Sequence, residues 1–196
     1  MIWQYRHEIM KLKLPAGQFK AYLLDCDGAI ADSMGLHYLA WSRALAEQGC
    51  ELSEDLFYAL GGMSVAEIIA RVNRERGLTM PVAHVEKRKE ELYLESLPQL
   101  KAIPEVLEHI DASYGRIPLA VVSGSTRDSV TASLSTLKML HKFATLVCAG
   151  EYRKGKPDPE PFLIAAKVLG VEPKDCLVFE DSDMGIQAAT AAAWRQ

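Results

Sequence analysis

The chain has 196 residues, of which 49% are hydrophobic, and a formal net charge of −4. This length supports one sizeable hydrophobic core with, at most, a small insertion. The mild negative charge argues against nucleic acid as a main partner, because neutralising its phosphates requires clustered lysines and arginines.

The first 19 residues mix charged and apolar side chains without an uninterrupted apolar segment, which predicts neither a signal peptide nor a membrane span. We expect residues 1–19 to form an appendage that packs at the edge of the sheet and carries no chemistry. The four cysteines form no C-x-x-C pair, so we expect buried, reduced thiols in a cytoplasmic protein.

A short apolar segment at residues 21–24 predicts a buried parallel strand, and Asp25, Cys26, Asp27 and Gly28 follow it directly. In an open parallel sheet, ligands bind beyond the carboxyl ends of the strands. Two carboxylates spaced i, i+2 point the same way from such an end, which suits a divalent cation, a nucleophile and an acid. The alternative is a turn in which both aspartates bind backbone amides.

Helical patterns fill residues 34–97. Gly49 is expected to end the first helix, Ser53 to begin the second, and Gly61-Gly62 to end it. Ser64 and Glu67 have the spacing of a capping box for the third helix. A fourth helix is expected between Pro81 and Pro98. Since a simple crossover between parallel strands needs one helix of about a dozen residues, four helices predict an inserted domain.

Alternating helices and strands resume after Pro98, with strands expected at 117–122, 145–148 and 176–179 and helices at 104–112, 127–139 and 160–169. Ser123-Gly124-Ser125-Thr126 follows the first of these strands. Such residues can present amides and a hydroxyl to an anion, or they can simply cap the next helix through Ser123 or Ser125.

Two further polar segments come later in the chain. Lys156 lies in a loop stiffened by prolines at 157, 159 and 161, although loop cations are usually only solvated. Glu180 and Asp181 follow the last strand and could merely cap the next helix. We expect that strand to lie beside the first one, which would bring Asp181 close to Asp25.

Four segments together resemble the sequence motifs of the haloacid dehalogenase superfamily of aspartate-nucleophile phosphotransferases. They are Asp-x-Asp-Gly-x-x-x-Asp-Ser at 25–33, Ser123 after a strand, Lys156 before Pro-Asp-Pro, and Glu-Asp-Ser-x-x-Gly-Ile at 180–186. The resemblance covers roughly 20–193 and holds the motifs in the same order. It implies that the helical insertion is a cap domain.

The resemblance implies a magnesium-dependent phosphatase that forms an aspartyl-phosphate on Asp25, with Asp27 as general acid and base. The implied site residues are as follows: catalytic Asp25, Asp27, Ser123 and Lys156; substrate-binding Gly28, His37, Lys89, Ser123, Gly124 and Lys156; and Mg²⁺-binding Asp25, Asp27 through its carbonyl, Asp181, and Glu180 nearby. His37 is equally compatible with a purely structural role.

The cap and the segment 35–41 look most like the sugar-phosphate branch, which includes small sugar phosphatases and β-phosphoglucomutase. The mutases carry an arginine where this chain has Val65, and this favours a phosphatase over a phosphomutase. Two alternatives outside hydrolysis are a receiver domain, which lacks a four-helix insertion, and a catalytically silent binding module.

The expected fold is α/β: a doubly wound, Rossmann-like core of residues 20–33 and 98–196, and a four-helix cap at 34–97. No pattern for the family's final core strand follows Ala193, so we expect that strand to be missing and 176–179 to lie at an open edge. The expected partner is a small phosphate ester. We expect a monomer that acts on neither nucleic acid nor membranes, with self-association through the open edge as the alternative.

Overall fold

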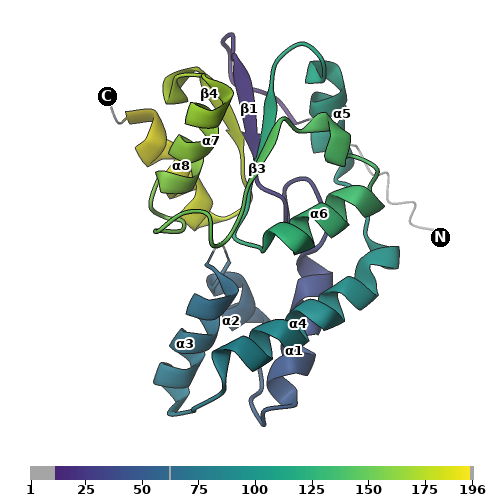
Figure 1. The fold of residues 1–196 in the computed structure, drawn as a ribbon, viewed down its shortest axis with the longest axis vertical. Helices are drawn as coiled ribbons and strands as arrows, with labels where there is room; N and C mark the ends of the chain where they lie inside the picture. The colour runs from purple at the N-terminus through teal and green to yellow at the C-terminus, as the bar shows by residue number, and fades with distance from the viewer. Residues whose placement is uncertain (1–11, 62, 195–196) are drawn as a thin grey trace, which may run out of the picture.

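A computed structural model describes residues 12–61 and 63–194. The predictions that concern residues 1–11, Gly62 and 195–196 lie outside this range. The described chain contains a core with a parallel sheet and a separate helical unit inserted after the first strand (Figure 1). None of the described helices is long and apolar enough to cross a bilayer.

The sheet has the order β3-β2-β1-β4, and each pair of neighbours is parallel. Its strands are β1 (Ala21–Leu24), β2 (Leu119–Val122), β3 (Thr145–Val147) and β4 (Cys176–Phe179). β1 lies between β2 and β4, as expected from the prediction that the last strand neighbours the first. The carboxyl ends of these three strands therefore meet at one edge of the sheet.

Helices cover both faces of the sheet (Figure 1). One face packs against α5 (Pro104–Ser113) and α6 (Arg127–Thr136), and the other against α7 (Glu160–Leu169) and α8 (Asp183–Trp194). Strands buried on two faces read as continuous apolar segments, and all four residues of β1 and of β2 are buried. The α/β doubly wound prediction is confirmed.

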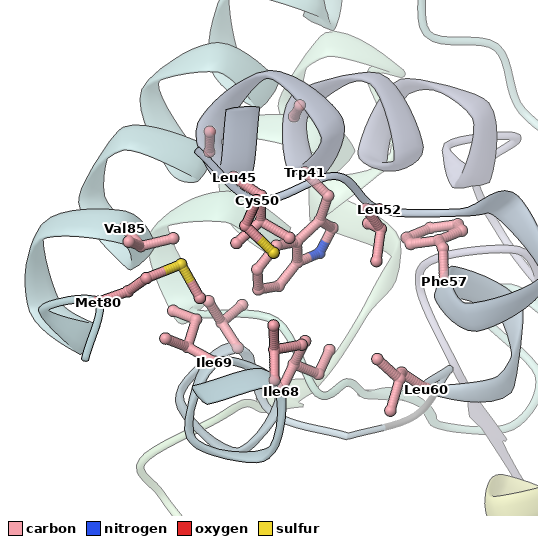
Figure 2. Close-up of a cluster of buried hydrophobic side chains, with 14 of the residues drawn as sticks. Trp41, Leu45, Cys50, Leu52, Phe57, Leu60, Ile68, Ile69, Met80 and Val85 are labelled. Atoms are coloured by element: carbon pink, nitrogen blue, oxygen red, sulfur yellow. The ribbon is translucent and has the colours of Figure 1, made fainter. Parts of the chain in front are cut away.

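The inserted unit consists of α1 (Met34–Ala46), α2 (Glu54–Ala59), α3 (Val65–Arg76) and α4 (Val82–Ser96). These helices pack around a hydrophobic cluster of their own, which is distinct from the two clusters that flank the sheet (Figure 2). The predicted capping box of α3 is present, since the Ser64 hydroxyl accepts from the Glu67 amide and the Glu67 carboxylate accepts from the Ser64 amide.

Several predicted boundaries are wrong by a few residues. β2 begins at Leu119 because Pro118 has no N–H for the ladder, and β3 ends at Val147. α6 ends at Thr136, where the chain turns through Lys138 in the left-handed region at φ 57°. α1 ends at Ala46, and Gly49 adopts φ 72° three residues later.

Within the described residues, β4 pairs only with β1 and lies at the sheet edge. Residues 12–15 line a groove together with Leu177, Val178 and Phe179, so this part of the appendage does lie beside β4. All four cysteines are free, but Cys176 is only half-buried because it belongs to the edge strand.

Candidate active site

Asp25 and Lys156 form a buried ion pair at the carboxyl end of β1. Lys156 comes from the loop before α7, and its Nζ donates to Asp25 Oδ1 at 2.7 Å and to Glu180 Oε2 at 2.6 Å. Burial raises the pKa of Asp25 and outweighs the opposing effect of the Lys156 ammonium. The two carboxylates raise the pKa of Lys156 despite its burial, so this side chain remains a cation.

Two further carboxylates, those of Glu180 and Asp181, lie beside this pair. Asp25, Glu180 and Asp181 each offer an oxygen, and these oxygens lie within 4.8 Å of one another. Burial and the neighbouring Glu180 raise the pKa of Asp181 to about 6. Carboxylates that destabilise one another's charge are stabilised by a bound cation, and an all-oxygen donor set suits a hard ion such as Mg²⁺.

Gly28 makes the approach of Asp181 possible. Its φ is 88°, in the region that favours glycine, and a Cβ at this position would overlap the Asp181 carboxylate. Gly28 is therefore required by the packing of the acidic cluster, and it lines the neighbouring groove together with Asp181.

Asp27 accepts hydrogen bonds from three side chains. Ser33 donates to Oδ1 at 2.8 Å, His37 Nε2 lies 2.9 Å from the same oxygen, and Ser125 donates to Oδ2 at 2.7 Å. Burial opposes ionisation of Asp27, but these donors outweigh it and hold the pKa well below its usual range. The side chain of Ser33 is engaged here, and α1 consequently begins without a side-chain cap.

His37 comes from α1 and brings the inserted helices into contact with Asp27. Its ring is buried and stacks on Tyr93 of α4 with centroids 3.9 Å apart. Burial and the nearby Lys89 ammonium lower the pKa of His37, although Asp27 opposes this. We therefore assign the neutral imidazole with its proton on Nε2, donated to Asp27.

The segment after β2 supplies a polar wall. Ser123 is buried, and its hydroxyl accepts from the amide of Ser125 at 3.0 Å. The alternative in which Ser123 or Ser125 caps α6 does not hold, because the Thr126 hydroxyl accepts from the Ser129 amide instead. Both serines are thereby left for the pocket.

Apolar side chains of the inserted unit, from its helices and from the loop between α2 and α3, also line the pocket. They are Met34, Trp41, Phe57, Leu60, Met63, Val65 and Ile68. Lys89 of α4 is the one cation among the described lining residues from these helices, and it is buried with its Nζ 3.4 Å from Glu90 Oε2. Arg71 points elsewhere and pairs with Glu75 on the exposed side of α3.

The structure brings the sequence-predicted residues to one place. Eight of them line this pocket: Asp25, Asp27, His37, Lys89, Ser123, Gly124, Glu180 and Asp181. Lys156 contacts two of these, and Gly28 packs against a third. Their catalytic and binding roles stay predictions.

The sequence did not predict that Ser33 and Ser125 would donate to Asp27, and Ser125 was considered only as an alternative cap for the next helix. Ser33 ends the first quoted motif and Ser125 lies three residues after β2, and these positions were the available signal. Tyr93 carried no such signal, because a tyrosine on an amphipathic helix is ordinarily a core residue.

Comparisons with known proteins identify a family, two relatives and a similar fold. The family model for haloacid dehalogenase-like hydrolases matches residues 22–195. The fructose-1-phosphate phosphatase YqaB of Escherichia coli is 32% identical over 178 residues, which cover 89% of this chain and 93% of YqaB. The β-phosphoglucomutase of Bacillus subtilis is 28% identical, with coverage of 88% and 80%. The crystal structure of CbbY from Rhodobacter sphaeroides with phosphate superposes with a TM-score of 0.82 at 24% identity, with coverage of 91% and 84%.

Proposed function

This chain belongs to the haloacid dehalogenase-like hydrolase family, and on that premise we propose that it is a magnesium-dependent phosphatase acting on a small sugar phosphate. The observation that carries the proposal is the buried Asp25–Lys156 pair beside two further carboxylates. A phosphate ester is a dianion that repels a carboxylate nucleophile, so a site for this reaction must first cancel negative charge. Lys156 supplies positive charge, and a cation held by the acidic cluster would add to it.

The domain assignment belongs to the same proposal. Residues 20–33 and 98–196 form the catalytic core, 34–97 form a cap over it, and 1–19 are an appendage. The separate hydrophobic cluster of α1–α4 and the position of the pocket between the two units support this division. The four free cysteines support a cytoplasmic location.

The cation would be held by Asp25, Asp181 and the backbone carbonyl of Asp27, with Glu180 close by. When bound, Mg²⁺ supplies charge neutralisation at the phosphate oxygens. The carboxylate oxygens present here are the ligands this ion prefers, whereas softer metals favour imidazole and thiolate.

Asp25 is the nucleophile. Its carboxylate attacks phosphorus in line with the leaving oxygen, so one P–O bond forms on Asp25 and the ester P–O bond breaks. Ser123 and Lys156 stabilise the oxygens of the transferring group. Water then attacks the aspartyl-phosphate, releasing inorganic phosphate and restoring Asp25.

Asp27 moves the protons. It takes a proton from solvent when the ester binds and gives it to the leaving alkoxide. It then takes a proton from the attacking water and returns it to solvent when phosphate leaves, so Asp27 ends the cycle ionised, as it began. Its three donors keep it ionised in the free enzyme. The negative charge of a bound phosphate ester raises the pKa of a neighbouring carboxyl group, and this change prepares Asp27 to carry the first proton.

The relatives and the pocket support the proposed substrate class. The Escherichia coli relative is a fructose-1-phosphate phosphatase, and Lys89 offers one cation to polar groups of a sugar. We therefore expect small phosphorylated sugars, with fructose 1-phosphate as the first one to assay.

A phosphomutase is the second candidate, favoured by the Bacillus subtilis relative and by the buried Lys89. A mutase must hold a second phosphate under the cap, and Val65 occupies the lining position where the mutases carry arginine. Without an arginine to hold the second phosphate, a bisphosphate intermediate would dissociate and water would accept the phosphoryl group.

The deciding experiment measures phosphate release from p-nitrophenyl phosphate and a panel of sugar phosphates, with Mg²⁺ and with excess EDTA. Magnesium-dependent release supports the phosphatase. A stable phosphorylated protein without turnover would show that hydrolysis of the aspartyl-phosphate fails, and the absence of both phosphate release and phosphorylation would point to a binding module. Conversion of β-glucose 1-phosphate to glucose 6-phosphate faster than phosphate release, with catalytic glucose 1,6-bisphosphate, would establish the mutase.

A further inference from the structure

The inserted helices meet the core along a seam between α4 and α6 (Figure 1). Among the residues that the structure describes, two side-chain hydrogen bonds cross this seam. The Tyr93 hydroxyl lies 2.8 Å from Ser133 Oγ, and the Thr126 hydroxyl donates to Glu90 Oε1 at 3.3 Å. Tyr93 is completely buried, so water does not compete for the hydrogen bond that its hydroxyl makes.

The direction of the Tyr93–Ser133 bond follows from what Ser133 already does. The Ser133 hydroxyl donates its single proton to the carbonyl oxygen of Ser129 at 2.9 Å. It therefore has only lone pairs to offer Tyr93, and the phenol must be the donor. Burial raises the pKa of Tyr93, so the phenol retains the proton that it donates. The tip of the Tyr93 ring is thus tied to a core helix.

The face of the same ring lies against His37. The two rings are 3.9 Å apart and nearly parallel, with an interplanar angle of 14°. A histidine ring rotates broadly about its last side-chain torsion, and a hydrogen bond weakens steeply as its angle departs from linearity. A fixed parallel neighbour is therefore what keeps His37 Nε2 directed at Asp27, 2.9 Å away.

We propose that Tyr93 is a positioning residue for the proton-transfer carboxylate: Ser133 fixes its ring, and the ring holds His37 against Asp27. The chain of contacts runs from the core helix α6 through α4 and α1 and returns to the core at β1. It makes the alignment of Asp27 depend on how the inserted helices are seated. This inference rests on the proposed function, because it gives Asp27 the role stated there.

Simple packing is the competing explanation, and a comparison of two substrates separates it from positioning. Protonation by Asp27 matters greatly when an alkoxide of a sugar leaves, and little when the weakly basic p-nitrophenolate leaves. A variant that only lowers the fraction of folded enzyme reduces kcat/KM equally for both. A variant that disturbs Asp27 reduces the ratio of the two values.

The test uses the full chain with Mg²⁺ and the sugar phosphate that the wild type hydrolyses fastest. For Tyr93→Phe and for Ser133→Ala we expect kcat/KM for the sugar phosphate, divided by kcat/KM for p-nitrophenyl phosphate, to fall about two- to tenfold, as the loss of one buried hydrogen bond implies. The double variant should lose no more than either single variant, since both remove the same bond. Tyr38→Phe is the matched control, because Tyr38 lies on α1 and its hydroxyl reaches only the carbonyl of Leu52.

The decisive comparison measures the effect of Tyr93→Phe a second time, in a protein that also carries His37→Asn. If Tyr93 acts through His37, Tyr93→Phe changes the substrate ratio in the wild type and leaves it unchanged in His37→Asn. An unchanged ratio in both Tyr93→Phe and Ser133→Ala overturns the proposal, and so does an equal loss with and without His37. A wild type that releases no phosphate from any ester contradicts the proposed function instead, so the two failures are distinguishable.

Discussion

The pocket has two contrasting sides. We call the charged side, at the carboxyl ends of the strands, the floor, and the apolar side, formed by the inserted helices and the loops between them, the roof. In the floor, Lys156 bridges two carboxylates and Asp27 accepts three hydrogen bonds. The roof is lined by side chains such as Trp41 and Leu60, which also belong to the hydrophobic cluster of the helices (Figure 2).

The difference reflects what each region must do. A floor that stabilises developing charge needs its groups fixed before substrate arrives, and buried pairs with several partners are fixed in this way. A roof excludes water and selects by shape, and apolar side chains in a separate core suit both tasks. Substitutions in the floor should therefore alter the chemistry, whereas substitutions in the roof should alter affinity, selectivity or stability.

The largest effect is expected for Asp25→Asn in the floor. Removing the nucleophile leaves groups that only assist it, so kcat for p-nitrophenyl phosphate should fall at least about 1,000-fold. Steady-state assays measure this, with circular dichroism to verify folding. Asp32→Asn, at an exposed position seven residues later, should retain normal turnover. Activity of Asp25→Asn within tenfold of the wild type would contradict the mechanism.

A smaller loss is expected for Asp27→Asn, and it should depend on the substrate. General acid–base catalysis contributes on the order of 100- to 10,000-fold, so the sugar phosphate should lose about that factor in kcat/KM. The loss for p-nitrophenyl phosphate should be at least tenfold smaller, because its leaving group needs little protonation. Equal losses for both substrates would remove Asp27 from the acid step. Rapid-quench detection of the aspartyl-phosphate should show slow formation and still slower hydrolysis.

The floor was more predictable from the sequence than the roof. Asp25, Asp27, Ser123 and Asp181 lie within three residues of the carboxyl ends of β1, β2 and β4, and parallel topology brings those strand ends together whatever the loops do. Lys156 was identified only by its resemblance to a family motif, because its spacing from Asp25 in the sequence carries no geometric information.

The unpredicted contacts depend on tertiary packing. The stack of Tyr93 on His37 and the bond of Ser125 to Asp27 each join segments far apart in the chain. Helical periodicity predicts that Tyr93 is buried, but it does not say against which ring. The boundary errors at Lys138 and Leu119 have a local origin, in a left-handed residue and in Pro118 respectively.

A moderate effect on affinity is expected when a cation is placed in the roof. Val65→Arg puts a guanidinium into a lining position, and a charge-assisted contact to a second phosphate should lower the inhibition constant for glucose 1,6-bisphosphate about tenfold. Val65→Met is the control, because it introduces a long unbranched side chain without charge. Inhibition of hydrolysis by the bisphosphate measures both. Equal inhibition constants in the two variants would mean that position 65 does not face the part of the pocket where a second phosphate binds.

The smallest effect is expected at the edge of the roof, for Ser64→Ala. The Ser64 hydroxyl caps α3 by accepting from the Glu67 amide, and it also donates to the Glu67 carboxylate at 2.7 Å. Loss of an N-cap of this kind lowers the free energy of unfolding by about 1 kcal/mol, which a urea titration measures. Ser64→Thr keeps the hydroxyl and should retain most of that stability. Because Ser64 lies outside the floor, kcat for p-nitrophenyl phosphate should stay within about twofold of the wild type while stability falls. A drop in kcat larger than the drop in folded fraction would show that the start of α3 aligns the floor, and the division between a chemical floor and a structural roof would then fail at this helix.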